Sequence, residues 1–344
     1  MNSSCNYTID DFKRSVFPAV YLLTFILGIA GHSVSICVFF SVWRKKRSLT
    51  SVNLFMVNLL VSDLMQVCSL PLRATYYLSN SHWPFGVWPC RLIFYVFYLN
   101  MYSSIFFLVS LNIMRYLALV QPYRFLRLQG CCSGPLVCAL IWLFVALASS
   151  PLLFTDSKDG AKKCLELPHG NATMINKLIL INNGTVTVGF VVPLLTILWC
   201  SLFVIHRLLK PSPAQRTVKA SRKKACALVI ISLGFFLISF LPYHIMRTLF
   251  LYTEWEGIRK AAVVTLCLGA ANSCLDPILF FFVGENFRSF FARLLRRKSP
   301  GNFPSCLLLL LSKLPIVCKN CHIHIRSCKS CHWGGTFKVF SAFD

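Results

Sequence analysis

Residues 186–205 read VTVGFVVPLLTILWCSLFVI, and none of these side chains carries a charge. A helix that crosses a lipid bilayer needs about 20 mainly apolar residues, because the hydrocarbon offers no water to its backbone groups. Six further stretches of comparable length and hydropathy lie along the chain. We therefore predict an all-α membrane protein, a seven-transmembrane helix bundle. The predicted spans are 17–42, 50–78, 88–120, 133–154, 179–208, 223–251 and 260–282.

The composition of the 344 residues favours the same class of protein. Apolar side chains make up 56% of the chain and charged side chains 13%, whereas soluble domains average about 25% charged residues. This argues against a soluble enzyme and against a disordered protein. A net charge of +24 would suggest nucleic-acid binding in a soluble protein. Here the bases lie in short segments between apolar runs, so we expect contact with membrane lipids and no nucleic-acid partner.

The distribution of Lys and Arg predicts the orientation. With the N-terminus outside, the inner loops and the segment after the seventh span hold many bases and a single acid, Glu285. Bases favour the cytoplasmic side, which predicts a multi-pass plasma-membrane protein with an outer N-terminus and an inner C-terminus. The expected parts are an extracellular N-terminus (1–16), the bundle (17–284), an amphipathic juxtamembrane helix (285–298) and a cytoplasmic Cys-rich tail (299–344).

The outer segments carry candidate modification sites. The predicted glycosylation sites are Asn2, Asn6 and Asn171. A fourth sequon, at Asn183, falls at the mouth of the fifth span and is not included. Three cysteines face outside, and a bridge between Cys90 and Cys164 would tie the long outer loop over the mouth of the bundle. Cys5 would then have no partner.

The tail contains two CxxC pairs, at residues 318–321 and 328–331. Such pairs can hold zinc, but the six residues between them fall short of the roughly 15–20 residues of zinc ribbons. Palmitoylation near the membrane is one alternative. A coding end without a selected function is another.

Only two acidic residues, Asp63 and Asp276, lie within the spans. Inserting a charged side chain at the centre of a span costs roughly 2.5–3.5 kcal/mol, so each such residue is expected to have a stabilising partner or a function. Asn100, Ser104 and Asn272 could share a polar cluster with the two acids. The cluster either holds a cation or proton between the second, third and seventh spans, or it is a hydrogen-bonded packing cluster without an ion. A bound cation is the one cofactor that this pattern suggests.

Two arginines, Arg73 and Arg247, lie in the outer thirds of the second and sixth spans. Tyr98, Tyr243 and His244 lie at a similar depth. Cationic groups beside tyrosines suit an anionic, partly lipidic ligand in a central cavity. The alternative is that both arginines extend to the outer interface, as long basic side chains do near helix ends.

The order and spacing of several motifs resemble those of rhodopsin-type (class A) G-protein-coupled receptors over residues 17–298. These motifs are residues 58–63 (NLLVSD), Cys90, 114–116 (MRY), Trp142, Pro193, 236–243 (FLISFLPY) and 276–280 (DPILF). The resemblance implies that Arg115 engages a heterotrimeric G protein when the sixth span swings outward. It also favours a sodium pocket made by Asp63, Ser104, Asn272 and Asp276.

A narrower resemblance rests on residues 70–77 (LPLRATYY), 98–106 (YLNMYSSIF) and 240–248 (FLPYHIMRT). These runs are similar to the cysteinyl leukotriene receptor family, and its type 2 subfamily fits best. The resemblance implies a pocket lined by Arg73, Tyr98, Tyr243 and Arg247, with cysteinyl leukotrienes as agonists. It further implies coupling to a Gq-type G protein, a rise in cytosolic calcium and no enzymatic activity.

Four positions depart from the common class A pattern: His32, Met114, Ser201 and Phe280. Met114 replaces the acid that usually pairs with the following arginine. Ser201 and Phe280 replace tyrosines whose hydroxyl groups meet in the active state, which favours a binding-competent receptor with weak signalling as one alternative. A receptor for another anion, such as a nucleotide or dicarboxylate, is a second. A transporter or membrane enzyme finds little support, because the chain has no internal repeat, no HExxH motif and no glycine-rich phosphate loop.

Overall fold

The computed structural model describes residues 3–46, 50–130, 133–153, 164, 172–209, 216–253 and 255–283, and the elements in these ranges are helices. In chain order they are α1 (Ser3–Lys46), α2 (Ser51–Leu78), α3 (Val87–Val120), α4 (Pro122–Gly130), α5 (Ser133–Ser149), a 3-10 turn (Ser150–Leu153), α6 (Ala172–Val186), a π-helix (Thr187–Val191), α7 (Val192–Leu209), α8 (Arg216–Tyr252) and α9 (Glu256–Val283).

Seven of the described helical segments are long and apolar enough to cross a membrane, as the sequence predicted. They are Ile9–Arg44, Ser51–Leu78, Val87–Val120, Ser133–Leu153, Asn176–Leu209, Cys226–Tyr252 and Glu256–Phe281. The fifth is continuous through α6, the π-helix and α7. The fold is therefore the expected seven-transmembrane bundle. The short helix α4 was not predicted. It begins at Pro122, a residue that suits the first helical position because its ring fixes φ.

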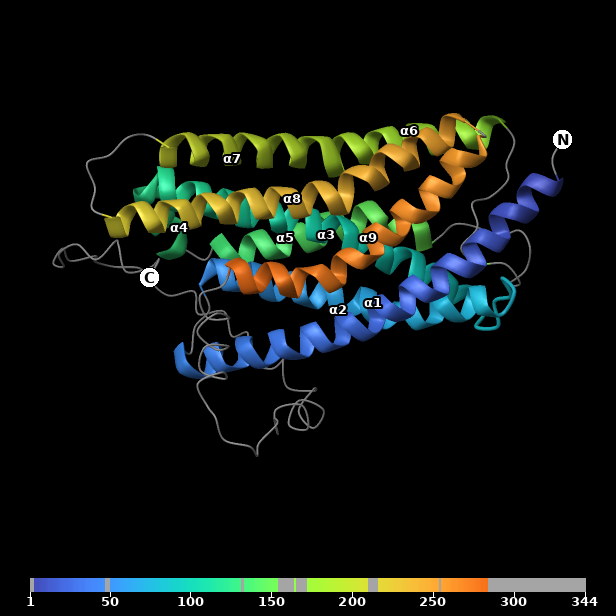
Figure 1. Ribbon diagram of the computed structural model, residues 1–344, viewed down its shortest axis with the longest axis horizontal. Coiled ribbons are helices and arrows are strands. Elements are labelled where there is room, and N and C mark those ends of the chain that lie inside the picture. Colours follow the sequence, from blue (N-terminus) through green and yellow to red (C-terminus); the bar gives the residue numbers. More distant parts are fainter. Residues whose placement is uncertain are drawn as a thin grey trace.

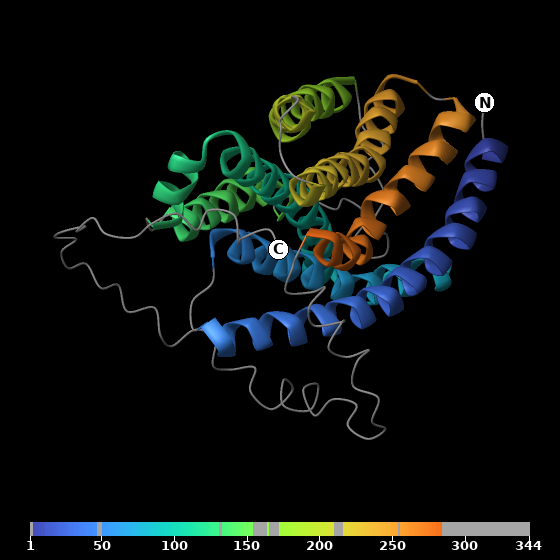
Figure 2. The same ribbon diagram turned by 60° about the vertical axis from the view of Figure 1, so that its left-hand side comes forward.

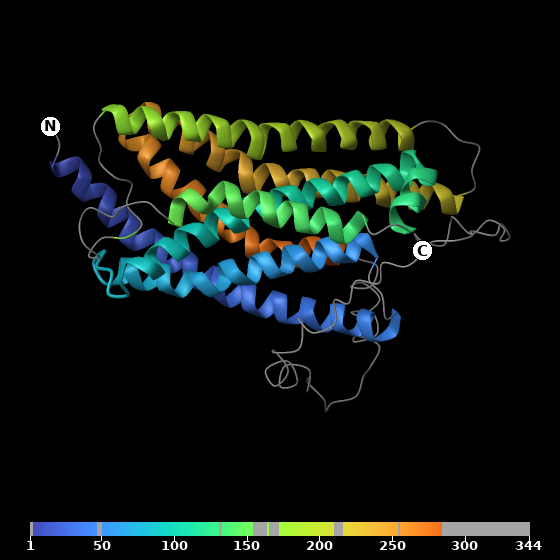
Figure 3. The same cartoon turned by 180° about the vertical axis from the view of Figure 1, so that it is seen from behind.

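The third helix lies at the centre of the bundle (Figures 1 and 2). It contacts α2, α5, α7 and, more sparsely, α8 and α9. Around it, α1 packs on α2 and α9, while α8 packs on α9 and α7. Figure 3 shows the same arrangement from behind, with α5 and α3 side by side in front of α8 and α9. Residues from α2, α3, α8 and α9 can therefore meet inside the bundle.

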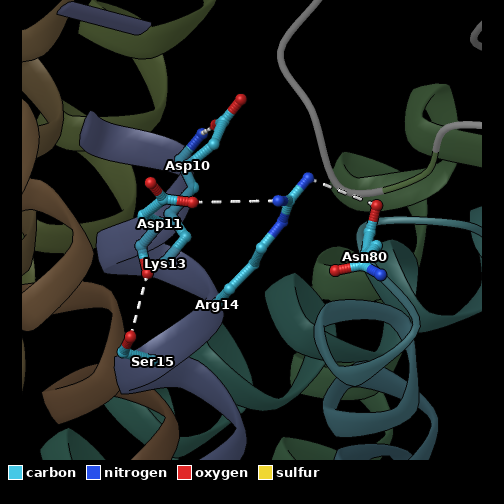
Figure 4. Close-up of polar contacts among 6 residues, drawn as sticks. All are labelled: Asp10, Asp11, Lys13, Arg14, Ser15 and Asn80. Atoms are coloured by element: carbon cyan, nitrogen blue, oxygen red, sulfur yellow. Dashed lines mark hydrogen bonds and ion pairs between the residues drawn. The ribbon is translucent and has the colours of Figure 1, made fainter. Parts of the chain in front are cut away.

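The first helix extends further toward the N-terminus than the sequence predicted, since it begins at Ser3 rather than near 17. Its charged side chains pair along the helix, with Lys13 3.0 Å from Asp10 and Arg14 3.8 Å from Asp11. Arg14 also donates to the backbone carbonyl of Asn80 at 3.4 Å, which ties α1 to the turn after α2 (Figure 4). These local pairs allow the helix to continue through a polar stretch.

Aromatic stacking and a disulfide hold the same end of the bundle together. Phe17 of α1 packs on Tyr77 of α2, with ring centroids 4.6 Å apart. Tyr76 in turn contacts Trp83, which follows α2. Cys90, at the start of α3, is bonded to Cys164, so the connection after α5 is anchored to α3.

Several predicted features lie outside the described residues or their side chains. Asn2 and Asn171, the juxtamembrane helix (285–298) and the tail (299–344) are outside the described ranges, and Asn6 is described only as part of the backbone of α1.

Candidate functional site

The centre of the candidate ligand site is Arg247 on α8. This side chain is part-buried, and its guanidinium interacts electrostatically with the phenol groups of Tyr98, Tyr243 and Tyr102. Tyr98 and Tyr243 lie within hydrogen-bonding reach of each other, and the rings of Tyr98 and Tyr102 stack with centroids 6.4 Å apart. One positive charge thus lies near three phenol groups, each able to donate or accept a hydrogen bond.

The second arginine, Arg73, lies against the ring of Phe97, on the side away from Tyr243. Its Nη2 donates to the backbone carbonyl of Ile93 at 2.6 Å, and its guanidinium carbon lies 4.9 Å from the ring centroid of Phe97. Phe97 also packs edge-on against Tyr243, with centroids 6.0 Å apart. The side chain of Arg73 is 3% exposed. Arg73 therefore points into the bundle rather than toward the outer interface, while its Nε has no hydrogen-bond partner among the described residues.

Aromatic rings close the inner end of this site. His244 stacks on Phe190 with centroids 4.2 Å apart and meets Tyr102 edge-on at 6.0 Å. Its Nδ1 donates to the backbone carbonyl of Phe240 at 2.8 Å, so in the neutral ring Nε2 is an acceptor. No described residue donates to that buried Nε2. A ligand that reaches this depth meets mainly aromatic surface and a single acceptor.

The π-helix brings α7 close to α3 at the same depth. A Cβ on Gly189 would lie 2.7 Å from Cε1 of Tyr102, so only glycine permits this approach. Such interruptions of α-helices are frequent at functional sites. Here the interruption spans residues 187–191 and places Phe190 beside His244.

The five residues predicted to line the pocket are therefore near one another, but in two parts. Tyr98, Tyr243 and Arg247 form one part, with His244 beneath them, and Arg73 lies beyond Phe97. Three further members were not predicted from the sequence: Phe97, Tyr102 and Phe190. The spacing of Tyr102, four residues after Tyr98 on one helix face, was an available signal. Phe97 and Phe190 had no comparable signal in an aromatic-rich chain.

A second polar group of residues lies deeper in the bundle. The carboxyl groups of Asp63 and Asp276 face each other within hydrogen-bonding reach. Asn100 donates from Nδ2 to Asp63 Oδ1 at 3.1 Å and also approaches Ser104 Oγ at 3.5 Å. Asn272 donates to Asp276 at 3.3 Å. The structure thus brings together the residues of the predicted polar cluster, and the side chains of all five are buried.

At the inner end of the bundle, Arg115 donates to the hydroxyl of Ser232 on α8. This bond joins α3 to α8 where the neighbouring Met114 supplies no carboxylate. The Ser201 hydroxyl is buried without a partner among the described residues. Phe280 is fully buried and packs edge-on against Phe39 at 5.8 Å. Among the described residues, the bond between Arg115 and Ser232 therefore links α3 to α8 at this end of the bundle.

Comparison with known proteins agrees with this geometry. Residues 34–280 match the model of the 7 transmembrane receptor (rhodopsin family). Cysteinyl leukotriene receptor 2 of Sus scrofa is 43% identical over 87% of both chains, and that of Homo sapiens is 41% identical over the same shares. Cysteinyl leukotriene receptor 1 of Homo sapiens is 37% identical over 83% of this chain and 87% of its own. The chain therefore belongs to the rhodopsin family of seven-transmembrane receptors and, within it, to the cysteinyl leukotriene receptors.

Proposed function

We propose that this chain is a plasma-membrane receptor for cysteinyl leukotrienes, with its N-terminus outside and its C-terminus inside. The observation that carries the proposal is the guanidinium of Arg247 among three tyrosines, above a floor of aromatic rings. A cysteinyl leukotriene combines carboxylates with a lipid tail. Arginine and phenol groups bind carboxylates through charge-assisted hydrogen bonds, while the aromatic floor suits the tail.

Signalling follows from a change in how α3 and α8 meet. In this structure, Arg115 is bonded to Ser232, and we take this arrangement as the resting one. Agonist contacts with Tyr243 and Arg247 act on the outer part of α8, and a ligand shifts a two-state bundle by its differential affinity for the two states. Outward movement of the inner part of α8 would break the bond and free Arg115 for a Gq-type G protein. Cytosolic calcium would then rise.

A calcium assay with parallel binding tests the agonist proposal. Cells that express the full chain are exposed to leukotrienes C and D, with and without a Gq inhibitor, and binding of a labelled leukotriene is measured on the same cells. A saturable rise that the inhibitor blocks supports both ligand class and coupling. Surface expression with neither binding nor calcium response would overturn the ligand proposal.

The polar cluster fits a monovalent cation. Two buried carboxyl groups that face each other either share a proton or, if both are ionised, need a bound cation between them. Asp63, Asp276 and Ser104 would supply the oxygens, and the ion would stabilise the resting arrangement of the helices. The substitution Asp63→Asn removes one charge at nearly constant shape, so it should abolish the effect of sodium on agonist affinity. An unchanged sodium effect would remove the ion from this site.

A nucleotide is the second candidate ligand. A relative named uracil nucleotide/cysteinyl leukotriene receptor, from Rattus norvegicus, is 37% identical over 83% of this chain. Phosphate groups suit the same two guanidinium groups. Competition of uracil nucleotides against a labelled leukotriene separates the two ligand classes, because a nucleotide receptor would release the label at low nucleotide concentration.

Weak signalling is an alternative outcome for the same receptor. Ser201 is buried without a described partner, and the buried Phe280 has no hydroxyl group to offer. Leukotriene binding without nucleotide exchange on the G protein would identify a receptor of this kind.

A further inference from the structure

The buried polar region around Asp63 has more hydrogen-bond acceptors than donors. Oδ2 of Asp63 has no donor among the described residues and faces the Asp276 carboxyl group. Two further fully buried polar side chains, His32 and Gln66, also have atoms without described partners: Nδ1 of His32, and both Oε1 and Nε2 of Gln66. A buried polar group left without a partner costs about 1–3 kcal/mol, so several such groups together indicate an occupant.

The hydrogen bond of His32 determines which of its ring atoms is an acceptor. Nε2 lies 2.6 Å from the backbone carbonyl of Ser273, which can only accept, so Nε2 carries the proton. In the neutral ring, Nδ1 therefore carries a lone pair and can only accept a hydrogen bond. An asparagine, the usual residue here in class A receptors, would likewise offer one donor for the carbonyl and one acceptor oxygen. His32 thus adds an acceptor to a region that already has a surplus.

Helix packing places His32 level with the acidic pair. The helices α1 and α2 are antiparallel neighbours, and a Cβ on Gly28 would lie 2.7 Å from Cγ2 of Val67. His32 lies four residues after Gly28 on α1, and Asp63 lies four residues before Val67 on α2. Each step is about one helical turn in the same direction, so helix geometry places His32 at the level of Asp63. On the α9 side, a Cβ on Gly31 would lie 2.9 Å from Cγ of Pro277, the residue after Asp276.

Gln66 occupies the next position toward the ligand site. It lies three residues after Asp63 on α2, so both side chains emerge on the same helix face. Seven residues further along that face is Arg73, at the edge of the ligand site. The amide of Gln66, with both polar atoms unpartnered, therefore stands between the acidic pair and the pocket.

We propose that the acidic pair binds its cation with water, and that His32 Nδ1 and the Gln66 amide hold these water molecules. The inference rests on the proposed cation at Asp63 and Asp276 and assigns two residues to it beyond the predicted cluster. A water molecule can donate one hydrogen to Nδ1 and one to a carboxylate, which satisfies both acceptors. The amide of Gln66 can accept from one water molecule and donate to another, and so it accounts for both of its unpartnered atoms.

Thermal unfolding of the purified full-length receptor tests the proposal. The melting temperature is measured against NaCl concentration, with choline chloride at equal ionic strength as the reference. A sodium ion that binds only the folded state raises the stability of the receptor as its concentration rises. The variants are His32→Leu and Gln66→Met, with Asp63→Asn to remove the ion site. Ser33→Ala is the matched control on α1, because its exposed hydroxyl bonds only to the Ile29 carbonyl.

Residues that orient metal ligands or their water typically change metal affinity 10–100-fold when mutated. We expect the sodium concentration for half-maximal stabilisation to rise at least tenfold in His32→Leu and in Gln66→Met. The Ser33→Ala variant should titrate like the parent. The substitution His32→Asn keeps an amide donor for Ser273 and an acceptor oxygen, so it tests the same role if His32→Leu does not fold, and it should restore most of the sodium response.

Two results would overturn the proposal, and they differ. If the parent responds to sodium and Asp63→Asn does not, but His32→Leu and Gln66→Met titrate like the parent, the cation stands and the roles of His32 and Gln66 fail. If the parent shows no sodium response beyond choline, the cation itself fails and this inference fails with it.

Discussion

Replacing Arg247 by alanine removes the positive charge around which Tyr98, Tyr102 and Tyr243 are arranged. Truncating one partner of a buried, hydrogen-bonded charge pair costs about 2–5 kcal/mol. Because Arg247 is only part-buried, solvent screens the pair, and the lower part of that range, about 2–3 kcal/mol, applies. At 1.4 kcal/mol per tenfold change, agonist affinity should fall about 25- to 150-fold.

The assay is competition binding on intact cells, with surface expression measured by an epitope tag on the same cells. Arg247→Lys keeps the charge but loses the planar fork, so its agonist affinity should fall between those of the parent and Arg247→Ala. Lys260→Ala is the matched control, because it removes a cation at the same end of the bundle from an exposed pair with Glu256, 2.7 Å away. Such pairs contribute about 0–1 kcal/mol. Equal losses of binding and expression in Arg247→Ala would show that the residue is structural and refute the reasoning.

Three further substitutions test other parts of the site. Ser232→Ala removes the partner of Arg115, a bond to a charged group worth about 1.5–3 kcal/mol, so basal nucleotide exchange should rise severalfold. An unchanged basal rate would show that this bond does not hold the resting state. Gly189→Ala places a Cβ 2.7 Å from the Tyr102 ring, and overpacking of about 1–3 kcal/mol should weaken leukotriene affinity in saturation binding. Arg73→Ala should lower the melting temperature of the ligand-free receptor, because the guanidinium is packed against a ring and a backbone carbonyl. A parental melting temperature with lost binding would instead assign Arg73 to ligand recognition alone.

The chain's own pattern predicted the membrane spans well and their outer ends less well. The second span was predicted at 50–78 and is Ser51–Leu78, and the third was predicted at 88–120 and is Val87–Val120. The first helix begins much earlier than expected because pairs such as Lys13 with Asp10 support helix beyond the apolar stretch. Hydropathy predicts the apolar segments that can cross a bilayer, but it does not predict where a helix continues through polar residues beyond them.

The residues of the site were harder to predict than the spans. The sequence singled out Arg247 and Asp63 because charged side chains inside spans are rare and need a stabilising partner or a function. It did not reveal that Phe97 separates Arg73 from Arg247, or that Gly189 lets α7 approach Tyr102. Those contacts join residues that are far apart in the chain. A phenylalanine or glycine in an apolar span looks like many others in the sequence, so its type does not indicate which residue it will contact.

Sequence by itself determined the class of protein, the number of spans and the family to which the motifs belong. It could do so because a helix in hydrocarbon must satisfy its backbone bonds within its own segment, which makes each span a local property. Only the tertiary structure decided which polar groups meet. The bond from His32 to the Ser273 carbonyl, and the bond from Arg115 to Ser232, depend on how helices pack, since no local rule fixes which faces of two distant helices come together.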